Sequence, residues 1–171
     1  AFLAKLLNYL DTSWAAAKAA GTPPPLVFSV SQNDCLNPCQ CANCQAIAQA
    51  EESECGPLLD FVNYLADGIK GQYPEAYIDT LAYQYTQKAP KTIRPRDNVI
   101  VRLCDTESDP SQPIIAEANQ AFREHLSRWA QIARNLRVWD YAVTYASPIG
   151  MPMPTAQTYG PDYRFYAAHH V

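Results

Sequence analysis

The chain has 171 residues, of which 48% are hydrophobic, so it is long enough to bury the core of a single domain over residues 1–171. Its formal net charge is −4 and its sequence pI is about 5.3, an acidic balance that argues against a nucleic-acid partner. No run of about eighteen apolar residues is present, so we expect no membrane-spanning helix.

Helical and strand-like segments alternate along the chain. Apolar residues at helical spacing predict a first helix that begins at Phe2 and ends before Gly21, a residue typical of a C-terminal cap. Runs of branched and aromatic residues between prolines and polar turns predict strands. The later predicted elements are a strand over 25–32, a helix from Pro57 to just before Tyr73, strands over 76–86 and 98–104, a long helix over 109–135, a strand over 136–145 and a helical segment over 155–171.

This order predicts an α/β fold with about four parallel strands and flanking helices. The strands are nearly continuous apolar runs, as expected where both faces of a sheet are covered. No glycine follows the strands that end near Asp34 and Cys104, which argues against a dinucleotide-binding fold. We therefore predict the C-terminal portion of a (β/α)8 barrel, cut from a longer chain. Its expected partner is the missing N-terminal part of the same barrel, because an open half-barrel exposes two sheet edges.

Each predicted strand becomes polar at its C-terminal end, and in a parallel barrel these ends meet at one mouth. Carboxylates, a guanidinium and aromatic rings together suit a sugar, whose ring stacks on aromatics while its hydroxyls form hydrogen bonds. Glycoside cleavage generally needs two carboxyl groups, and we predict Asp34 and Asp140 as the catalytic pair, with Asp105 in reserve. The predicted substrate-binding residues are Asn33, Tyr83, Tyr85, Arg102, Trp139 and Tyr141.

Structural roles compete with these assignments. Arg102 and Asp140 lie in apolar strands and would then pair with each other, since a buried charge needs a partner. Tyr83 and Tyr85 would be core residues, Asp34 a turn residue, and Asp105 part of a solvated loop. The three histidines, His125, His169 and His170, match no zinc-protease or nucleophile motif, so we expect no histidine catalysis.

Five segments resemble one bacterial family of uncharacterised domains found in large, usually exported, presumed glycan-degrading proteins. They are FSVSQNDC (28–35), CQCANCQ (39–45), LLDFVNYLADGI (58–69), LAYQYTQKAPKTIRPRDNVIVRLC (81–104) and LRVWDYAVTY (136–145). That family is similar to the catalytic barrels of α-glucuronidases and, more distantly, of hexosaminidases. The resemblance implies a (β/α)8 barrel with a sugar-binding mouth, and a secreted, periplasmic or cell-surface location.

Four of the six cysteines follow the first strand with the spacing C-x3-C-x-C-x2-C. An even number of cysteines suits disulfides in an exported protein, with Cys55 and Cys104 each joining one of the four. A zinc site made of Cys35, Cys39, Cys41 and Cys44 is the alternative, although structural zinc sites usually gather two separated pairs. Free thiols are the third interpretation. In the disulfide interpretation, the loop braces the mouth beside Asp34.

Three functions therefore remain open. The first is a glycoside hydrolase-like barrel that acts on polysaccharide, including glycans that contain uronic acid or N-acetylhexosamine, without a cofactor. Arg102 would suit an acidic sugar, because a guanidinium binds a carboxylate with two hydrogen bonds. The second is a non-catalytic carbohydrate-binding barrel, and the third is a structural domain braced by cysteines or zinc.

Overall fold

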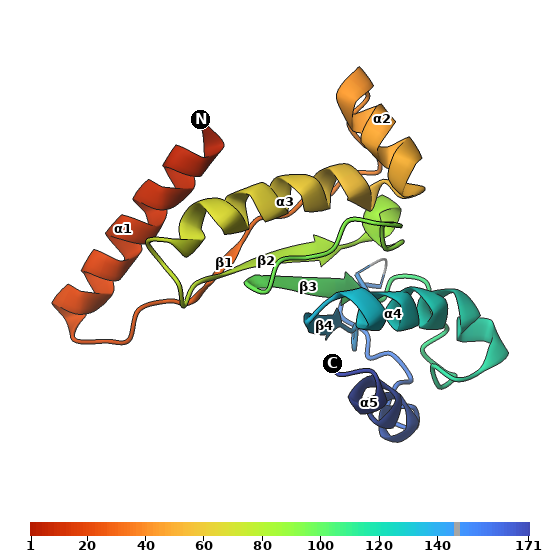
Figure 1. The fold of residues 1–171 in the computed structure, drawn as a ribbon. Helices are drawn as coiled ribbons and strands as arrows, with labels where there is room; N and C mark the ends of the chain where they lie inside the picture. Colours follow the sequence, from red (N-terminus) through yellow and green to blue (C-terminus); the bar gives the residue numbers. More distant parts are fainter. Residues whose placement is uncertain (146–147) are drawn as a thin grey trace.

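The computed structural model describes residues 1–145 and 148–171, in which four parallel strands form one sheet in the order β1-β2-β3-β4 (Figure 1). The elements are α1 (Phe2–Ala20), β1 (Val27–Ser29), α2 (Ala42–Glu51), α3 (Cys55–Lys70), β2 (Tyr77–Ala82), the 3-10 turn η1 (Gln84–Thr86), β3 (Val99–Cys104), η2 (Glu117–Asn119), α4 (Gln120–Ile132), β4 (Asn135–Trp139) and α5 (Tyr159–Ala168). The prediction of an α/β fold with four parallel strands and flanking helices is confirmed.

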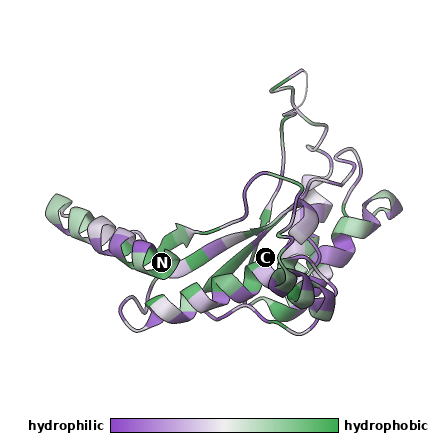
Figure 2. Ribbon diagram, turned by 90° about the horizontal axis from the view of Figure 1, so that it is seen from above, coloured by the Kyte–Doolittle hydropathy of each residue, from purple (hydrophilic) through white to green (hydrophobic). Residues whose placement is uncertain are grey.

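The hydrophobic core lies between one face of the sheet and the helices that cover it. Strand residues alternate between the two faces, and the register places Ile78 beside Val99 and Val101 beside Leu136 on the covered face. Apolar side chains of α3 and α4, such as Leu65 of α3, are fully buried in the same cluster. Figure 2 shows the corresponding hydrophobic colouring along the strands.

The helix α1 is packed by aromatic contacts. Tyr9 meets Phe28 of β1 edge to face, with ring centroids 5.9 Å apart. Phe2 meets Phe61 of α3 in the same way, with centroids 5.3 Å apart. At its end Gly21 adopts φ 66°, the left-handed conformation that glycine tolerates best, and this confirms the predicted cap. These contacts fix α1 against the covered side of the sheet.

One helix was not predicted, and the predicted bounds of a second helix and of three strands were wrong. The helix α2 was not predicted, because its alanines and glutamines give it little amphipathic pattern. The long helix over 109–135 is shorter, since α4 begins only at Gln120. The buried amide of Asn119 donates hydrogen bonds to the carbonyl groups of Asp109, Gln112 and Pro113 and holds residues 109–119 in a loop. The predicted strands also overran, and three of them end at Ser29, Ala82 and Trp139.

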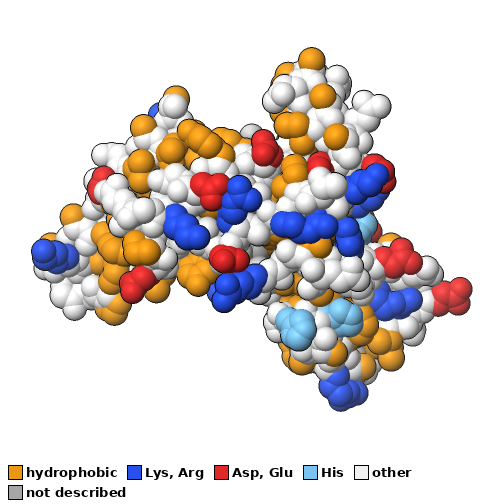
Figure 3. All heavy atoms as spheres, in the orientation of Figure 1, with side chains coloured by type: hydrophobic (Ala, Val, Ile, Leu, Met, Phe, Trp, Pro, Cys, Tyr) orange, Lys and Arg blue, Asp and Glu red, His pale blue; other side chains and the backbone are white. Residues whose placement is uncertain are grey.

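Charges of both signs are interspersed over the face seen in Figure 3. Exposed ion pairs account for part of this pattern, among them Lys91 with Glu52 and Arg96 with Asp67. Within 1–145 and 148–171, no helix combines the length and the apolar character needed to cross a membrane.

Candidate functional site

A cavity of about 490 Å³ is lined by residues that end or follow each of the four strands. Each strand end contributes to its wall: Asp34 follows β1, Tyr83 follows β2, Asp105 follows β3 and Trp139 ends β4. Asp140 and Tyr141 continue the wall directly after β4. The structure therefore brings together both predicted catalytic carboxylates, the reserve carboxylate and three of the predicted substrate-binding residues.

Asp34 is held by residues that follow β2. The Tyr83 hydroxyl donates a hydrogen bond to Asp34 Oδ1 over 3.1 Å, and Gln84 Nε2 donates to the same hydroxyl over 2.9 Å. A second hydrogen bond joins the loop after β1 to the segment after β2, since the side-chain amide of Gln32 donates to the carbonyl group of Tyr83 over 3.1 Å. Burial, and then the neighbouring Asp34, raises the pKa of Tyr83. The loop after β1 thus presents its carboxylate to the cavity in a defined position.

Asp105 and Asp140 lie on adjacent strand ends. The backbone N–H of Asp105 donates to the carbonyl group of Trp139 over 3.0 Å, which extends the β3–β4 ladder into the cavity wall. Asp105 Oδ1 accepts a hydrogen bond from the Ser108 N–H, and Asp140 Oδ1 accepts one from the Tyr141 N–H. Burial raises the pKa of both carboxyl groups, and the charge of Asp140 raises that of Asp105 further. A raised pKa is the property required of a general acid.

The far wall comes from segments that sequence reasoning did not connect with the site. Asp162 of α5 is buried and accepts a hydrogen bond from the Ile114 N–H over 2.7 Å, so it tethers the loop before α4. Asp109 accepts hydrogen bonds from the N–H and hydroxyl of Ser111, which lower its pKa. Tyr166 of α5 completes this wall. The one signal in the sequence was a single aspartate, Asp162, among the tyrosines of the final helix.

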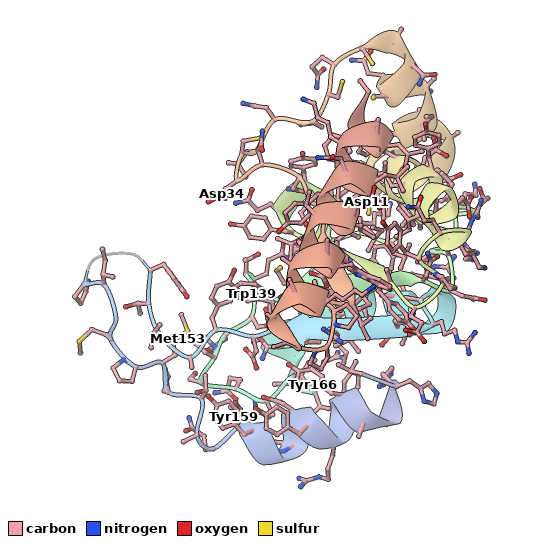
Figure 4. The ribbon with its side chains drawn as sticks, turned by 90° about the vertical axis from the view of Figure 1, so that its left-hand side faces the viewer. Asp11, Asp34, Trp139, Met153, Tyr159 and Tyr166 are labelled. Carbon is pink, nitrogen blue, oxygen red and sulfur yellow. The ribbon has the colours of Figure 1, made fainter. Side chains whose placement is uncertain are left out.

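Aromatic rings line the cavity beside the carboxylates. Trp139 is 40% exposed, and its ring lies 6.5 Å from that of Tyr141, which in turn meets Tyr145 edge to face at 5.5 Å. Burial raises the pKa of Tyr141 to about 12, so its hydroxyl stays protonated at neutral pH. Figure 4 shows Asp34, Trp139, Met153 and Tyr166 arranged around this region from different segments of the chain.

Arg102 does not line the cavity and does not pair with Asp140. Its Nη2 lies 3.1 Å from Asp79 Oδ2, and its guanidinium carbon lies 5.5 Å from the centroid of the Trp139 ring. The alternative interpretation, in which Arg102 pairs with Asp140, was wrong because Asp79 of β2 shares the open face of the sheet with Arg102. Burial raises the pKa of Asp79, and Arg102 partly offsets this effect. The pair forms a charged layer under Trp139.

Two other predicted substrate-binding residues also lie outside the cavity wall. Asn33 is exposed, and its carbonyl group accepts a hydrogen bond from the Cys35 N–H over 2.8 Å. Tyr85 is half-buried in a shallow depression beside Glu54, because β2 ends early and the η1 turn directs the following side chains elsewhere. Of the residues predicted from sequence, only those directly at the strand ends, and Asp34 on the loop held by Tyr83, therefore line the cavity.

All six cysteines are free thiols in the structure, which does not show the predicted disulfides. Cys55 and Cys104 are buried at the start of α3 and the end of β3, and burial raises their pKa values to about 12 and about 11. Three of the four clustered cysteines, Cys39, Cys41 and Cys44, have sulfur atoms within 4.8 Å of one another. Cys35 lies outside this group.

These observations define a parallel α/β domain with a cavity of carboxylates and aromatic rings at the C-terminal ends of its strands. The chain belongs to the family described as domain of unknown function (DUF4838), whose model matches residues 12–171. Neither a curated protein nor a solved structure matches the chain.

Proposed function

We propose that the chain is the C-terminal part of a glycoside hydrolase-like (β/α)8 barrel and that its cavity binds and cleaves a glycan. The observation that carries the proposal is that residues ending or following all four strands line one cavity, which holds several carboxylates beside exposed aromatic rings. The active sites of (β/α)8 enzymes lie at this end of the strands.

The strand order supports the barrel. Successive strands are neighbours throughout β1-β2-β3-β4, whereas a doubly wound sheet reverses its order at a switch point. Charged residues such as Asp79 and Arg102 occupy the sheet face opposite the helix-covered core. In the described part of the chain, the outer sides of β1 and β4 carry no further strand, and the missing part of the barrel would pair there.

The carboxylates divide into two groups by their hydrogen bonds. Asp109 and Asp162 hold loops, so neither is free to react. We assign Asp140 as the general acid, because partial desolvation of its carboxyl group at the cavity wall raises its pKa and the nearby Asp162 raises it further. Asp34 is exposed and held by the Tyr83 hydroxyl, a position that suits a nucleophile or a base. Asp105 lies deeper, where burial and then the charge of Asp140 raise its own pKa.

The exposed face of Trp139 and the ring of Tyr145 would stack on sugar rings. Arg102 is already paired with Asp79, so we do not assign it to a sugar carboxylate. A panel of aryl glycosides identifies the sugar.

The test separates binding from cleavage. Oligosaccharide binding is measured by calorimetry on the full chain, and hydrolysis of an aryl glycoside panel is measured on the protein that also supplies the missing barrel half. Asp140→Asn and Asp34→Asn should each lower the rate by about 10²–10⁴-fold while binding is retained. Trp139→Ala should abolish binding.

Two exposed residues of α3 outside the cavity provide matched controls, since Asp60→Asn and Tyr64→Ala should change neither property. If the protein binds oligosaccharides but hydrolyses no aryl glycoside of the panel, the enzymatic assignment is contradicted and a carbohydrate-binding barrel is favoured. The absence of binding to every oligosaccharide would contradict both.

A further inference from the structure

Three cysteine sulfur atoms converge on the loop that connects β1 to α2. The Sγ atoms of Cys39, Cys41 and Cys44 all lie within 4.8 Å of one another, and these side chains are exposed or half-buried. Cys41 is the N-cap of α2, and Cys44 lies in the first turn of that helix. The cluster is separate from the cavity, but it lies on the same loop as Asp34.

The spacing of the sulfur atoms is close to that of a metal–thiolate site. With Zn–S bonds of about 2.3 Å and tetrahedral angles, sulfur ligands of one zinc ion lie roughly 3.8 Å apart, so small side-chain rotations would complete the geometry. The N–H of Cys44 donates to Cys41 Sγ over 3.5 Å, and hydrogen bonds of this kind orient and tune metal-bound thiolates. A disulfide would use two of the three sulfur atoms and leave the third without a function.

We propose that Cys39, Cys41 and Cys44 bind one thiophilic cation, Zn²⁺, with the fourth coordination position open to an exogenous ligand. Sulfur ligands select zinc over magnesium or calcium, which prefer oxygen. Cys35 is not a ligand in this proposal, because its sulfur atom lies outside the cluster and contacts the carbonyl group of Asn37 instead. The bound ion would fix the end of the loop that carries Asp34 to the start of α2.

The experiment titrates the reduced full chain with Zn²⁺ against a chromophoric chelator and repeats the titration with Co²⁺. We expect one ion per chain and a Co²⁺ spectrum with sulfur-to-metal charge transfer. Serine substitution of any of the three cysteines removes a direct ligand, so Cys39→Ser, Cys41→Ser and Cys44→Ser should each weaken binding by more than ~100-fold. Cys35→Ser, on the same loop, is the matched control and should bind as the unmodified chain does.

Far-UV circular dichroism checks that each variant is folded. A second measurement needs no variant: bound Zn²⁺ should protect Cys39, Cys41 and Cys44, but not Cys35, from alkylation detected by mass spectrometry. Loss of binding in Cys35→Ser would overturn the ligand assignment. Isolation of the unreduced chain with a disulfide between two of the three cysteines, or failure of Zn²⁺ to protect them, would overturn the metal site itself.

Discussion

Replacing Arg102 by Met tests the role of the charged layer beneath Trp139. The side chain of Asp79 is only 4% exposed and that of Arg102 is 27% exposed, and their nearest N and O atoms are 3.1 Å apart. Methionine retains most of the aliphatic stem but leaves the buried carboxylate without its partner. Breaking a buried ion pair from one side costs about 3–5 kcal/mol, and we expect a loss of about 3 kcal/mol at pH 7 because Arg102 is partly hydrated.

Protonation of Asp79 limits the loss. At pH 7, protonating a carboxyl group with an ordinary pKa near 3.9 costs about 4 kcal/mol, at 1.36 kcal/mol per pH unit, and at pH 5 it costs only about 1.5 kcal/mol. Burial already raises the pKa of Asp79 in the folded chain, and removing Arg102 raises it further. A carboxyl group whose pKa is higher in the folded than in the unfolded state binds more protons when folded. The stability of Arg102→Met should therefore fall as the pH rises from about 4 through the folded pKa.

Thermal and urea unfolding of both proteins at pH 5 and pH 7 measure this difference. A loss of 3 kcal/mol lowers the Tm by roughly 6–12 °C in a chain of this size. Asp79→Asn combined with Arg102→Met should recover much of the loss and its pH dependence, since no buried charge remains. Arg134→Met, which breaks the exposed pair with Asp97, is the control and should change stability little. Equal destabilisation by Arg102→Met and Arg134→Met, or a loss independent of pH, would refute the reasoning.

The remaining predictions concern the cavity and the core. Because burial raises the pKa of Asp140, initial hydrolysis rates should fall as the pH rises through that pKa, and Asp140→Asn should remove this alkaline limb from the pH–rate profile. Leu65 is fully buried, so Leu65→Ala should cost about 2–5 kcal/mol in urea unfolding, whereas Leu36→Ala at an exposed site should cost little. Asn119→Ala should cost about 2 kcal/mol, because carbonyl groups in the loop before α4 lose their donor, and it should also weaken oligosaccharide binding measured by calorimetry.

Each of the three predictions, on Asp140, Leu65 and Asn119, would be contradicted by one specific result. A rate profile whose alkaline limb persists in Asp140→Asn would assign that limb to another group. Equal effects of Leu65→Ala and Leu36→Ala would place the core elsewhere, and unchanged oligosaccharide binding in Asn119→Ala would separate its loop from the site.

The sequence was sufficient to predict the sheet and several of the residues that line the cavity at its C-terminal edge. Branched and aromatic runs are strong strand signals, and the polar residue that ends each run marks the C-terminal edge of a parallel sheet. Asp34, Asp140 and Trp139 were predicted from this rule alone, and they line the cavity. The ends of the strands were predicted less accurately, because apolar residues continue past the end of β4. One of them, Val143, forms an isolated β-bridge with Pro152 instead of extending the strand.

Residues distant in sequence could not be placed in the same way. Asp162 reaches the cavity because α5 folds back beneath the strand ends, and no local pattern encodes that path. The ion pair of Arg102 with Asp79 depends on the register between β2 and β3, which the sequence does not give. Asp79 itself lies within an otherwise apolar strand and was not predicted as a partner. The cysteine cluster depended on an unpredicted helix, since α2 brings Cys44 back over Cys41.

The most direct test of the central claim is an NMR titration of the full chain with a glycan oligosaccharide. If the strand ends form a sugar site, amide shifts should concentrate around Asp34, Tyr83, Trp139 and Tyr145, with little change at the depression between α3 and Arg94. Shifts at that depression, or at the opposite ends of the strands, would contradict the proposed carbohydrate site.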